Sequence, residues 1–521
     1  MRRRPSLVSS LAALAALLGA GADRAGAGEG GPPNLLVILT DDQGWPTLGS
    51  YGGDKVPTPH LDALAARGTR FTRAYVTPQC TPTRATLLTG RYAPGHRMWH
   101  VIGPYGYPFA RVEEPSFRAN LPRDAWTFPK ALREAGYVTA IAGKWHLTNG
   151  EDGNYIGLNP AAATRYGFDH APPPVGPEQF EPGADRGVDL LTEQTLAFVE
   201  RNRDRPWFCL LSHHAVHGKV VAPEPLVEKY LALGTPEEGR RNATYLALLD
   251  HLDASVGRLT AGLECLGEAE ETVIVFLSDN GGVDVKLGGT DLPSAEPGAT
   301  LPAVERQYDN APLREGKGSL YEGGVRVPLI AAGPGIGAGR VVTEPVHAVD
   351  LAPTLLSLAG AEVASLPENA ALAGVDLSPA LTGESTALLA DRPVYQYCPF
   401  YDLRWGLTPG ASVVRGQWKL IAFFGDRIDG GDAPGRSAGE DAGVYRVGPA
   451  AELYDLAADP GEQVDLAAAR PEIAAELNTL LRDWITASGA TIPGPNPAFD
   501  PARGFTEIRG VGAEPTRERP R

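Results

Sequence analysis

A cysteine opens the segment that carries the most chemical information in this chain. Cys80 begins the run CTPTRATLLTGR, in which Pro82 lies two residues on and Arg84 four residues on. Proline is favoured in the first turn of a helix, where its missing N–H costs nothing, so Cys80 is predicted to lie at a helix N-terminus. The helix dipole favours negative charge there, which suits a nucleophile that must receive an anionic group. The alternative is a buried structural cysteine in front of a helix.

Two pairs of residues that could bind a metal through carboxylate or amide oxygens each closely follow an apolar run. The pairs are Asp41-Asp42 and Asp279-Asn280. Two adjacent carboxylates repel each other unless a cation joins them, and hard oxygen donors suit Ca²⁺ or Mg²⁺ rather than Zn²⁺. Either pair alone is explained equally well as ordinary turn residues after a strand. Together, at the ends of two core strands, the pairs predict a metal site.

Basic and histidine side chains follow two further apolar runs. Lys144 and His146 are two residues apart, so on an extended segment both would point to one face, where they could hold an anion and move a proton. His213, His214 and His217 carry the same ambiguity between a site role and a structural one. Because only one or two of these three can face a common site, His213 is predicted to be structural.

Short apolar runs that read as strands alternate with amphipathic stretches, which predicts an α/β fold with a mostly parallel sheet. The runs are residues 34–40, 137–141, 208–211, 273–277 and 327–332. Helical spacing is found in residues 59–65, 128–135 and 245–266. In open α/β sheets, ligands bind beyond the carboxyl ends of the strands. The first four runs end in the polar clusters described above, so these clusters are expected to converge on one site.

The pattern of predicted secondary structure changes at about residue 393. Short strand-like runs follow, then a Gly/Asp-rich stretch at 425–443 that reads as a flexible loop, and an amphipathic helix at 471–488. We therefore expect a catalytic domain over residues 33–392 and a small C-terminal α+β subdomain over residues 393–490. Residues 491–521 are rich in Pro, Gly and Arg and are predicted to form an irregular tail.

The N-terminus and the overall charge bear on location and partners. Residues 1–22 read as a secretory signal, with three arginines, an apolar stretch and small residues, and a second cleavage point lies at residue 27. Cleavage removes the three arginines and no acid, which changes the formal net charge from −16 to −19. An acidic chain of this kind argues against nucleic acid as a partner. We expect an exported protein, periplasmic or extracellular, with no integral membrane span after cleavage.

The segments described so far resemble the sulfatase family. Cys80–Arg91 is similar to the family's Cys-x-Pro-x-Arg motif, in which the cysteine is oxidised after translation to formylglycine. The order of the motifs along the chain is more specific than any one of them. The other matching segments are Asn34–Trp45 with the first metal pair, Gly143–Leu147, Leu277–Gly282 with the second pair, Gly316–Pro328, and Glu452–Leu456 with Asp459-Pro460.

The resemblance implies an alkaline-phosphatase-like sandwich: a large mixed, mostly parallel central sheet flanked by helices, plus the small C-terminal subdomain. It implies an arylsulfatase-type hydrolase of aryl sulfates or sulfated carbohydrates that releases inorganic sulfate. Ca²⁺, in preference to Mg²⁺, would be held by Asp41, Asp42, Asp279 and Asn280. A formylglycine-generating maturase is the implied protein partner.

The resemblance also implies a role for each site residue. The hydrated formylglycine at position 80 would attack sulfur and release the alcohol. The remaining roles are deprotonation of the attacking hydroxyl by Asp279, stabilisation of the diol by Arg84 and Lys144, sulfate binding and help to the leaving oxygen by His217 and Lys317, and removal of the second hydroxyl proton by His146. Lys317 lies on a glycine-rich loop, where lysines are usually solvated, so its assignment depends most on the resemblance.

One segment departs from the family pattern, and two other functions stay open. The family's His-x-Pro-His segment reads His214-Ala215-Val216-His217 here, without the proline. A phosphoester or phosphonate monoester hydrolase on the same fold is one alternative, because sulfate and phosphate are nearly isosteric. A non-catalytic binder of sulfated glycans is the other. The Tyr-, Pro- and Phe-rich stretch Met98–Ala119 is predicted to line the substrate cleft, where its rings could stack on sugars.

Overall fold

The structure is a computed structural model, and it describes residues 31–505 apart from short gaps. The gaps are residues 102–105, 240, 285, 288–296, 299, 306–307, 309, 362–370 and 431–440. The predicted signal peptide and residues 506–521 of the predicted tail lie outside the described residues. Among the helices of the described part, none is both long and apolar enough to cross a membrane.

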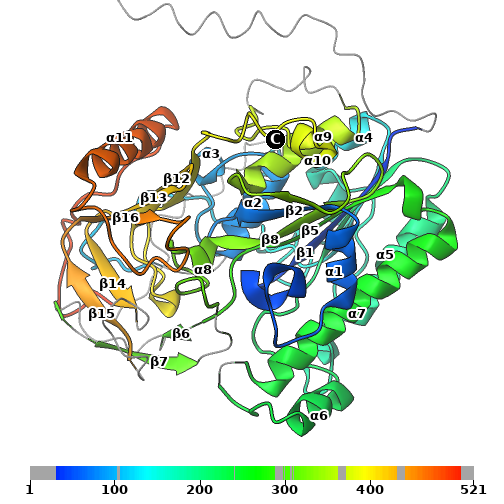
Figure 1. Cartoon of the computed structure of the whole chain (residues 1–521), viewed down its shortest axis with the longest axis horizontal. Coiled ribbons are helices and arrows are strands. Elements are labelled where there is room, and N and C mark those ends of the chain that lie inside the picture. Colours follow the sequence, from blue (N-terminus) through cyan, green and yellow to red (C-terminus); the bar gives the residue numbers. More distant parts are fainter. Residues whose placement is uncertain are drawn as a thin grey trace, which may run out of the picture. The chain divides into compact units, whose positions relative to one another are not determined.

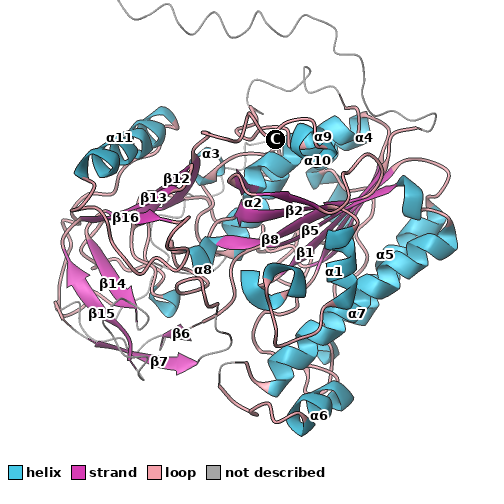
Figure 2. Ribbon diagram, in the orientation of Figure 1, coloured by secondary structure: helices cyan, strands magenta, loops and turns pink. Residues whose placement is uncertain are grey.

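An eight-stranded sheet forms the centre of the unit that begins at Pro33 (Figure 2). Its order is β10-β2-β8-β5-β1-β4-β3, with β9 also paired to β2. Strands β5, β1, β4 and β3 are parallel, whereas β8 runs antiparallel to β5 and β2, so the predicted mixed, mostly parallel sheet is confirmed. The strands are β1 (Asn34–Thr40), β2 (Thr69–Tyr75), β3 (Val138–Gly143), β4 (Trp207–Ser212), β5 (Thr272–Ser278), β8 (Arg326–Ala332), β9 (Arg340–Val342) and β10 (Val346–His347).

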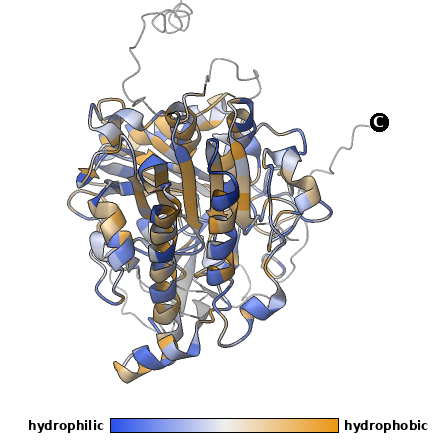
Figure 3. Ribbon diagram, turned by 90° about the vertical axis from the view of Figure 1, so that its right-hand side faces the viewer, coloured by the Kyte–Doolittle hydropathy of each residue, from blue (hydrophilic) through white to orange (hydrophobic). Residues whose placement is uncertain are grey.

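Helices cover both faces of this sheet (Figure 1). Successive side chains of a strand point to opposite faces, and in β1 the odd-numbered Leu35 and Leu39 pack into one hydrophobic cluster while Leu36 and Ile38 pack into another. Strands buried on both faces need apolar residues at every position, and the central strands are accordingly largely orange in Figure 3. The first cluster is closed by α2 (Cys80–Thr89), α4 (Phe128–Glu134), α9 (Leu351–Leu358) and α10 (Ser378–Thr382), and the second by α1 (Pro59–Ala66), α5 (Val188–Arg201) and α7 (Ala243–Leu266).

The signals that begin and end these helices are local. Proline opens α1, and the side chain of Asn242 accepts from the backbone N–H of Tyr245 at 2.9 Å to cap α7. Gly267 ends α7 in a left-handed conformation, as a glycine after the last helical residue usually does. Three further helices, α3 (Ala93–His96), α6 (Glu224–Ala232) and α8 (Glu322–Val325), lie in the connections.

A second sheet, antiparallel and four-stranded, follows the central one in the chain and has the order β11-β12-β13-β16. Helix α11 (Pro471–Ala487) packs on it through Leu477, Leu481 and Ile485. The predicted C-terminal α+β subdomain is therefore confirmed as part of the fold. The strands are β11 (Val394–Cys398), β12 (Gly410–Arg415), β13 (Trp418–Phe423) and β16 (Ala450–Asp455).

The prediction of a loop at 425–443 is wrong at both ends of the stretch, and residues 431–440 lie outside the described residues. The stretch contributes β14 (Asp426–Gly430) and the start of β15 (Asp441–Val447), which pair with β7 (Thr300–Glu305) and through it with β6 (Lys286–Leu287). The sequence did not indicate β14, because a buried strand rarely begins with an acidic residue such as Asp426. Here Asp426 is buried and accepts a hydrogen bond from the Tyr401 hydroxyl at 2.8 Å and one from Tyr445.

The prediction that the aromatic rings of Met98–Ala119 line a cleft is wrong for three of them, whereas Tyr105 lies outside the described residues. Trp99 and Phe117 are buried in the hydrophobic cluster of the C-terminal sheet, and Tyr107 is buried against Tyr401. Large aromatic surfaces next to an uncovered sheet face are more stable when buried than when exposed to water. These three rings therefore belong to the core.

Candidate active site

The carboxyl ends of four parallel strands meet at one edge of the central sheet. Asp41 and Asp42 follow β1, Lys144 follows β3, the histidine segment follows β4, and Asp279 follows β5. The Lys144 ammonium donates to Asp41 Oδ2 at 2.6 Å, which joins the ends of β3 and β1. The backbone N–H of Asp42 donates to Asp279 Oδ1 at 3.3 Å, which joins β1 and β5. The structure thus brings together clusters that are far apart in the sequence.

Asp41, Asp42, Asp279 and Asn280 form a fully buried group, here called the oxygen quartet. Among the described residues, Asp41 Oδ1, Asp42 Oδ2 and Asn280 Oδ1 have no hydrogen-bond partner in the protein. Buried oxygens without partners are costly, and a hard divalent cation satisfies such oxygens directly. The quartet therefore fits a divalent metal ion.

The backbone explains the sequence around the quartet. Asp42 has a left-handed conformation with φ of 61°, which aspartate tolerates better than most residues and which is typical of functional sites. Gly281 follows Asn280, and a Cβ there would lie 1.8 Å from the carbonyl oxygen of Gly323. The N–H of Gly281 donates to the carbonyl of Gly324 at 3.0 Å. The Asp-Asn-Gly-Gly turn therefore packs directly on the Glu-Gly-Gly segment.

Cys80 is the first residue of α2, as predicted. Its Sγ lies 3.2 Å from His146 Nδ1, and the Thr81 hydroxyl donates to the His146 carbonyl at 3.0 Å. Burial raises the pKa of the Cys80 thiol, although Lys144 and Lys317 oppose the shift. An unmodified Cys80 is therefore a neutral thiol at neutral pH. The positive charges of Lys144 and Lys317 are then available to attract an anionic group that binds beside Cys80.

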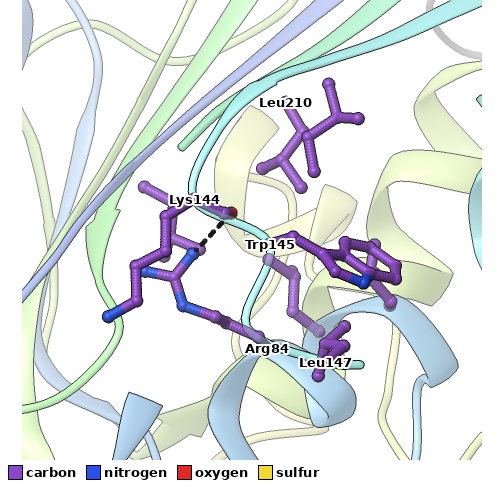
Figure 4. Close-up of a pocket in the computed structure, with 9 residues that line it drawn as sticks. Arg84, Lys144, Trp145, Leu147 and Leu210 are labelled. Carbon is purple, nitrogen blue, oxygen red and sulfur yellow. Dashed lines mark hydrogen bonds between the residues drawn. The ribbon is translucent and has the colours of Figure 1, made fainter. Parts of the chain in front are cut away.

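Arg84 lies one helical turn after Cys80 and ties three elements together. Its Nε and Nη2 donate to Asp279 Oδ2 at 2.9 and 2.6 Å. Its Nη1 donates to the Ser212 hydroxyl at 2.5 Å and to the Lys144 carbonyl at 3.2 Å; Figure 4 shows this second contact. Burial raises the pKa of Asp279 to about 6, although Arg84 opposes the shift. The guanidinium thus orients both a quartet carboxylate and the segment that carries Lys144.

Two further residues, Lys317 and His217, contact the quartet from loops and do not directly follow any of the four strands. The Lys317 ammonium donates to Asp42 Oδ1 at 2.6 Å and is buried, so it is not the solvated loop lysine that its sequence context suggests. His217 Nε2 lies 3.7 Å from Asp42 Oδ2, and its Nδ1 lies 3.3 Å from the Tyr155 hydroxyl. Burial, with Lys317 beside it, lowers the pKa of His217 well below its ordinary value, so the ring is neutral.

The segment that carries Lys144 and His146 is turned rather than extended, which corrects the expected geometry. Gly143 has φ of 97° and His146 has φ of 54°, so the alternation of an extended chain does not apply. The turn still directs both side chains to the site, with Lys144 on Asp41 and His146 on Cys80.

His213 and His214 are packed inside the protein. Both are fully buried, and neither ring forms a hydrogen bond within the described residues. The ring of His214 lies against Phe180 and Tyr155, with ring centroids 5.4 and 5.8 Å away. Burial lowers the pKa of His213 to about 4. Of the three histidines, His217 is the one whose ring reaches the quartet.

Arg186 is a residue that sequence reasoning missed. Its Nε donates to the His214 carbonyl at 3.1 Å, its Nη1 to the Lys219 carbonyl at 2.5 Å, and its Nη2 to the Tyr155 hydroxyl at 3.4 Å. These bonds hold the histidine segment, which lacks the proline of the family pattern. No sequence signal points to Arg186, since a single arginine between loops is usually solvated.

A small cavity lies behind Arg84 and Lys144 (Figure 4). No member of the oxygen quartet lines it, so the cavity is separate from the candidate metal site. Its other lining residues are Leu39, Leu87, Leu88, Ile141, Trp145, Leu147 and Leu210.

Carboxylates that follow the strands gather with two lysines and an arginine at the N-terminus of α2. This arrangement suits a hydrolase of anionic esters. The chain belongs to the sulfatase family: the family Sulfatase matches residues 33–361, and the family N-sulphoglucosamine sulphohydrolase, C-terminal, matches residues 316–430. The predicted family is confirmed, and the protein is a sulfuric ester hydrolase.

Known relatives cover most of the chain. Arylsulfatase A of Homo sapiens is 33% identical over 489 residues, which span 86% of this chain and 87% of that protein. N-acetylgalactosamine-6-sulfatase of Canis lupus familiaris is 33% identical, over 74% of this chain and 72% of that protein. The crystal structure of the phosphonate monoester hydrolase of Agrobacterium radiobacter is similar in fold, with a TM-score of 0.60 and 22% identity over 88% of this chain and 96% of that one.

Proposed function

We propose that this sulfatase cleaves sulfate esters at Cys80 after its conversion to formylglycine, beside a Ca²⁺ ion held by the oxygen quartet. One observation carries the proposal. Potential ligand atoms of Cys80, Asp41 and Asp279 all lie within 4.8 Å of one another, at the N-terminus of α2. A reacting group at position 80 is therefore next to both the metal ligands and the helix dipole.

Asp41, Asp42, Asp279 and Asn280 would hold the cation. Oxygen ligands alone suit Ca²⁺ and Mg²⁺, and Ca²⁺ is favoured because it tolerates an irregular arrangement, whereas Mg²⁺ demands a near-ideal octahedron. When bound, the cation neutralises charge that develops on the sulfuryl oxygens.

The basic residues bind the sulfate group. Three cations, Arg84, Lys144 and Lys317, balance the three quartet carboxylates, so a divalent cation leaves the site with a net positive charge. This local field attracts an anionic ester to a chain whose formal net charge changes from −16 to −19 when residues 1–22 are removed. Lys144 and Lys317 offer ammonium protons to sulfate oxygens. His217 would assist the leaving oxygen through Nε2, which requires this nitrogen to carry a proton when the substrate is bound, because Nδ1 lies 2.6 Å from the Gly218 carbonyl and donates to it.

His146 and Asp279 handle protons at position 80. His146 Nδ1 lies 3.2 Å from Cys80 Sγ. His146 can therefore reach a hydroxyl group on the modified side chain at position 80. The formylglycine hydrate supplies two hydroxyl groups, one to attack and one through which the site is regenerated. Asp279 accepts the proton of the first hydroxyl and His146 that of the second.

We further propose a sulfated carbohydrate as substrate, with aryl sulfates as surrogates. The name of the relative N-acetylgalactosamine-6-sulfatase supports this choice. The proposal includes a formylglycine-generating maturase as partner and export of the protein, which rests on the pattern of residues 1–22. Its domains would be the catalytic one over 33–392 and the subdomain over 393–490.

The test compares Cys80→Ala with wild-type protein from the native host. Turnover of 4-nitrophenyl sulfate, 4-nitrophenyl phosphate and a phenylphosphonate monoester should show a preference for sulfate in the wild type and no turnover in the variant. Cys265→Ala is the matched control, because Cys265 is exposed and lies outside the site. Wild-type-like activity of Cys80→Ala would contradict the mechanism. A preference for the phosphorus esters would favour the alternative hydrolase, and sulfated-glycan binding without turnover would favour the binder.

A further inference from the structure

An aromatic side chain lies beside one of the sulfate-binding lysines. The ammonium of Lys317 is 5.0 Å from the centroid of the Trp405 ring and lies over the ring. The same ammonium donates to Asp42 Oδ1 at 2.6 Å. One face of the indole is therefore turned toward the group that holds the sulfate. Trp405 is only partly buried, so this residue keeps part of its surface open to a ligand.

The contact between the two loops is close. Gly318, the residue after Lys317, has φ of 83°, and a Cβ there would lie 2.1 Å from the Cβ of Trp405. Gly318 also donates its N–H to the carbonyl of Pro78 at 2.8 Å. The glycine thus lets the Lys317 loop pack against Trp405 on one side and against the chain before Cys80 on the other.

The loop that carries Trp405 is also fixed to the nucleophile segment. Trp405 ends the short 3-10 helix Leu403–Trp405. Asp402, just before this helix, accepts from Gln79 Nε2 at 2.7 Å, and Gln79 directly precedes Cys80. Arg404 donates to both oxygens of Asp402 at 2.8 and 2.5 Å. The indole is therefore held rigidly relative to the reacting position, as a platform for a ligand requires.

Other rings near the site are occupied by protein contacts. Tyr155 is partly buried and has Lys144 over its ring at 4.7 Å, as Trp405 has Lys317, but Tyr155 also lies against the rings of His146 and His217. Trp99 and Phe117 are buried in the C-terminal cluster. The stacking role expected for Met98–Ala119 therefore does not lie with Trp99 or Phe117, and Trp405 is another aromatic residue placed to take it.

We propose that Trp405 is a specificity residue, whose indole face stacks on the sugar ring of a sulfated pyranose bound at the site. The inference rests on the proposed function and names the part of the substrate that the C-terminal subdomain recognises. The ester joins sulfate and sugar through one oxygen, so a sugar whose sulfate is held by Lys317 is within reach of the Trp405 ring, 5.0 Å from that ammonium. The C–H face of a pyranose is apolar, and an indole is the side chain that offers the largest flat apolar surface to it.

The experiment measures competition against turnover of 4-nitrophenyl sulfate by the matured enzyme. The competitors are inorganic sulfate and a panel of galactopyranoses and glucopyranoses, each monosulfated at one ring hydroxyl or at the exocyclic hydroxyl. In the wild type, at least one sugar sulfate should bind more tightly than inorganic sulfate. Trp405→Ala should weaken that sugar sulfate roughly tenfold, and Trp405→Phe about threefold, with the inhibition constant of inorganic sulfate unchanged.

Trp418→Ala is the matched control, because Trp418 is partly buried in the same subdomain and packs against the C-terminal cluster. It should leave every constant unchanged. Equal weakening of sugar sulfate and inorganic sulfate by Trp405→Ala would show that Trp405 acts only by positioning Lys317, and would overturn the proposal. Failure of every sugar sulfate to bind better than inorganic sulfate would also overturn it. Absence of any wild-type turnover would instead contradict the proposed function.

Discussion

Replacing Lys419 with methionine should destabilise the protein strongly, because this lysine joins the C-terminal sheet to the segment beside the oxygen quartet. Lys419 lies on β13, fully buried, with its ammonium 2.9 Å from Glu322 Oε1 and 2.9 Å from Glu462 Oε1. Arg326 Nη1 lies 3.3 Å from Glu322 Oε2. Glu322 begins α8, whose Gly324 accepts from the N–H of Gly281 next to the quartet.

The magnitude follows from charge balance. Lys419 and Arg326 balance the charges of Glu322 and Glu462. The variant therefore leaves one of the two carboxylates uncompensated in the protein interior. Removal of one partner from a buried ion pair costs about 3–5 kcal/mol. Burial already raises the pKa of Glu462 to about 7, and without Lys419 this carboxyl takes up a proton more readily still. A group whose pKa is raised by folding stabilises the folded state at low pH, so the destabilisation should be largest above about pH 7.

Urea unfolding at about pH 8 and about pH 6 measures both effects. The double variant Lys419→Met, Glu462→Gln should recover roughly half of the loss at the higher pH, since it removes the uncompensated charge. Lys229→Met is the control: its ion pair with Asp250 is partly exposed, and its loss should cost about 1 kcal/mol or less. A double variant as unstable as the single one would refute the charge-balance reasoning.

Three further predictions address the metal, the histidine segment and a second buried carboxyl. Dialysis against a chelator should abolish turnover and lower the thermal midpoint, and Ca²⁺ should restore both; an unchanged midpoint would contradict the metal assignment. Arg186→Met should lower kcat/KM for sulfate esters roughly a hundredfold by displacing the His217 segment, with Arg186→Lys intermediate, and steady-state kinetics that match the wild type would contradict the positioning role. Asp426→Asn should flatten the pH dependence of unfolding free energy between about pH 4 and about pH 6. Burial raises the pKa of Asp426 to about 6, so the wild type loses roughly 3 kcal/mol as pH rises through that range, and an equally steep profile in the variant would count against this.

The central sheet and the convergence of polar clusters were predictable because both depend on local sequence. A run such as residues 34–40, which is apolar from Leu35 to Leu39, is typical of a strand covered on both faces. Parallel strands then bring whatever follows them to one edge. Asp41, Lys144 and Asp279 could therefore be grouped before any contact between them was known.

What could not be predicted depends on contacts between loops. Arg186 and Tyr155 carry no periodic or motif signal, and their roles follow from hydrogen bonds to the histidine segment. Trp405 has a place near the site only because Gln79 and Lys317, both far away in sequence, contact its loop. The strand that begins at Asp426 could not be predicted, because an aspartate is rare in a buried strand. It is stable here because the hydroxyls of Tyr401 and Tyr445 donate to its carboxylate.

The most direct test of the central claim is the mass of the tryptic peptide that carries Cys80, measured on protein from the native host that turns over a sulfate ester. Conversion of the thiol to the aldehyde predicts a loss of about 18 Da relative to the unmodified peptide. An unmodified Cys80 peptide from protein that is fully active on sulfate esters would contradict the account.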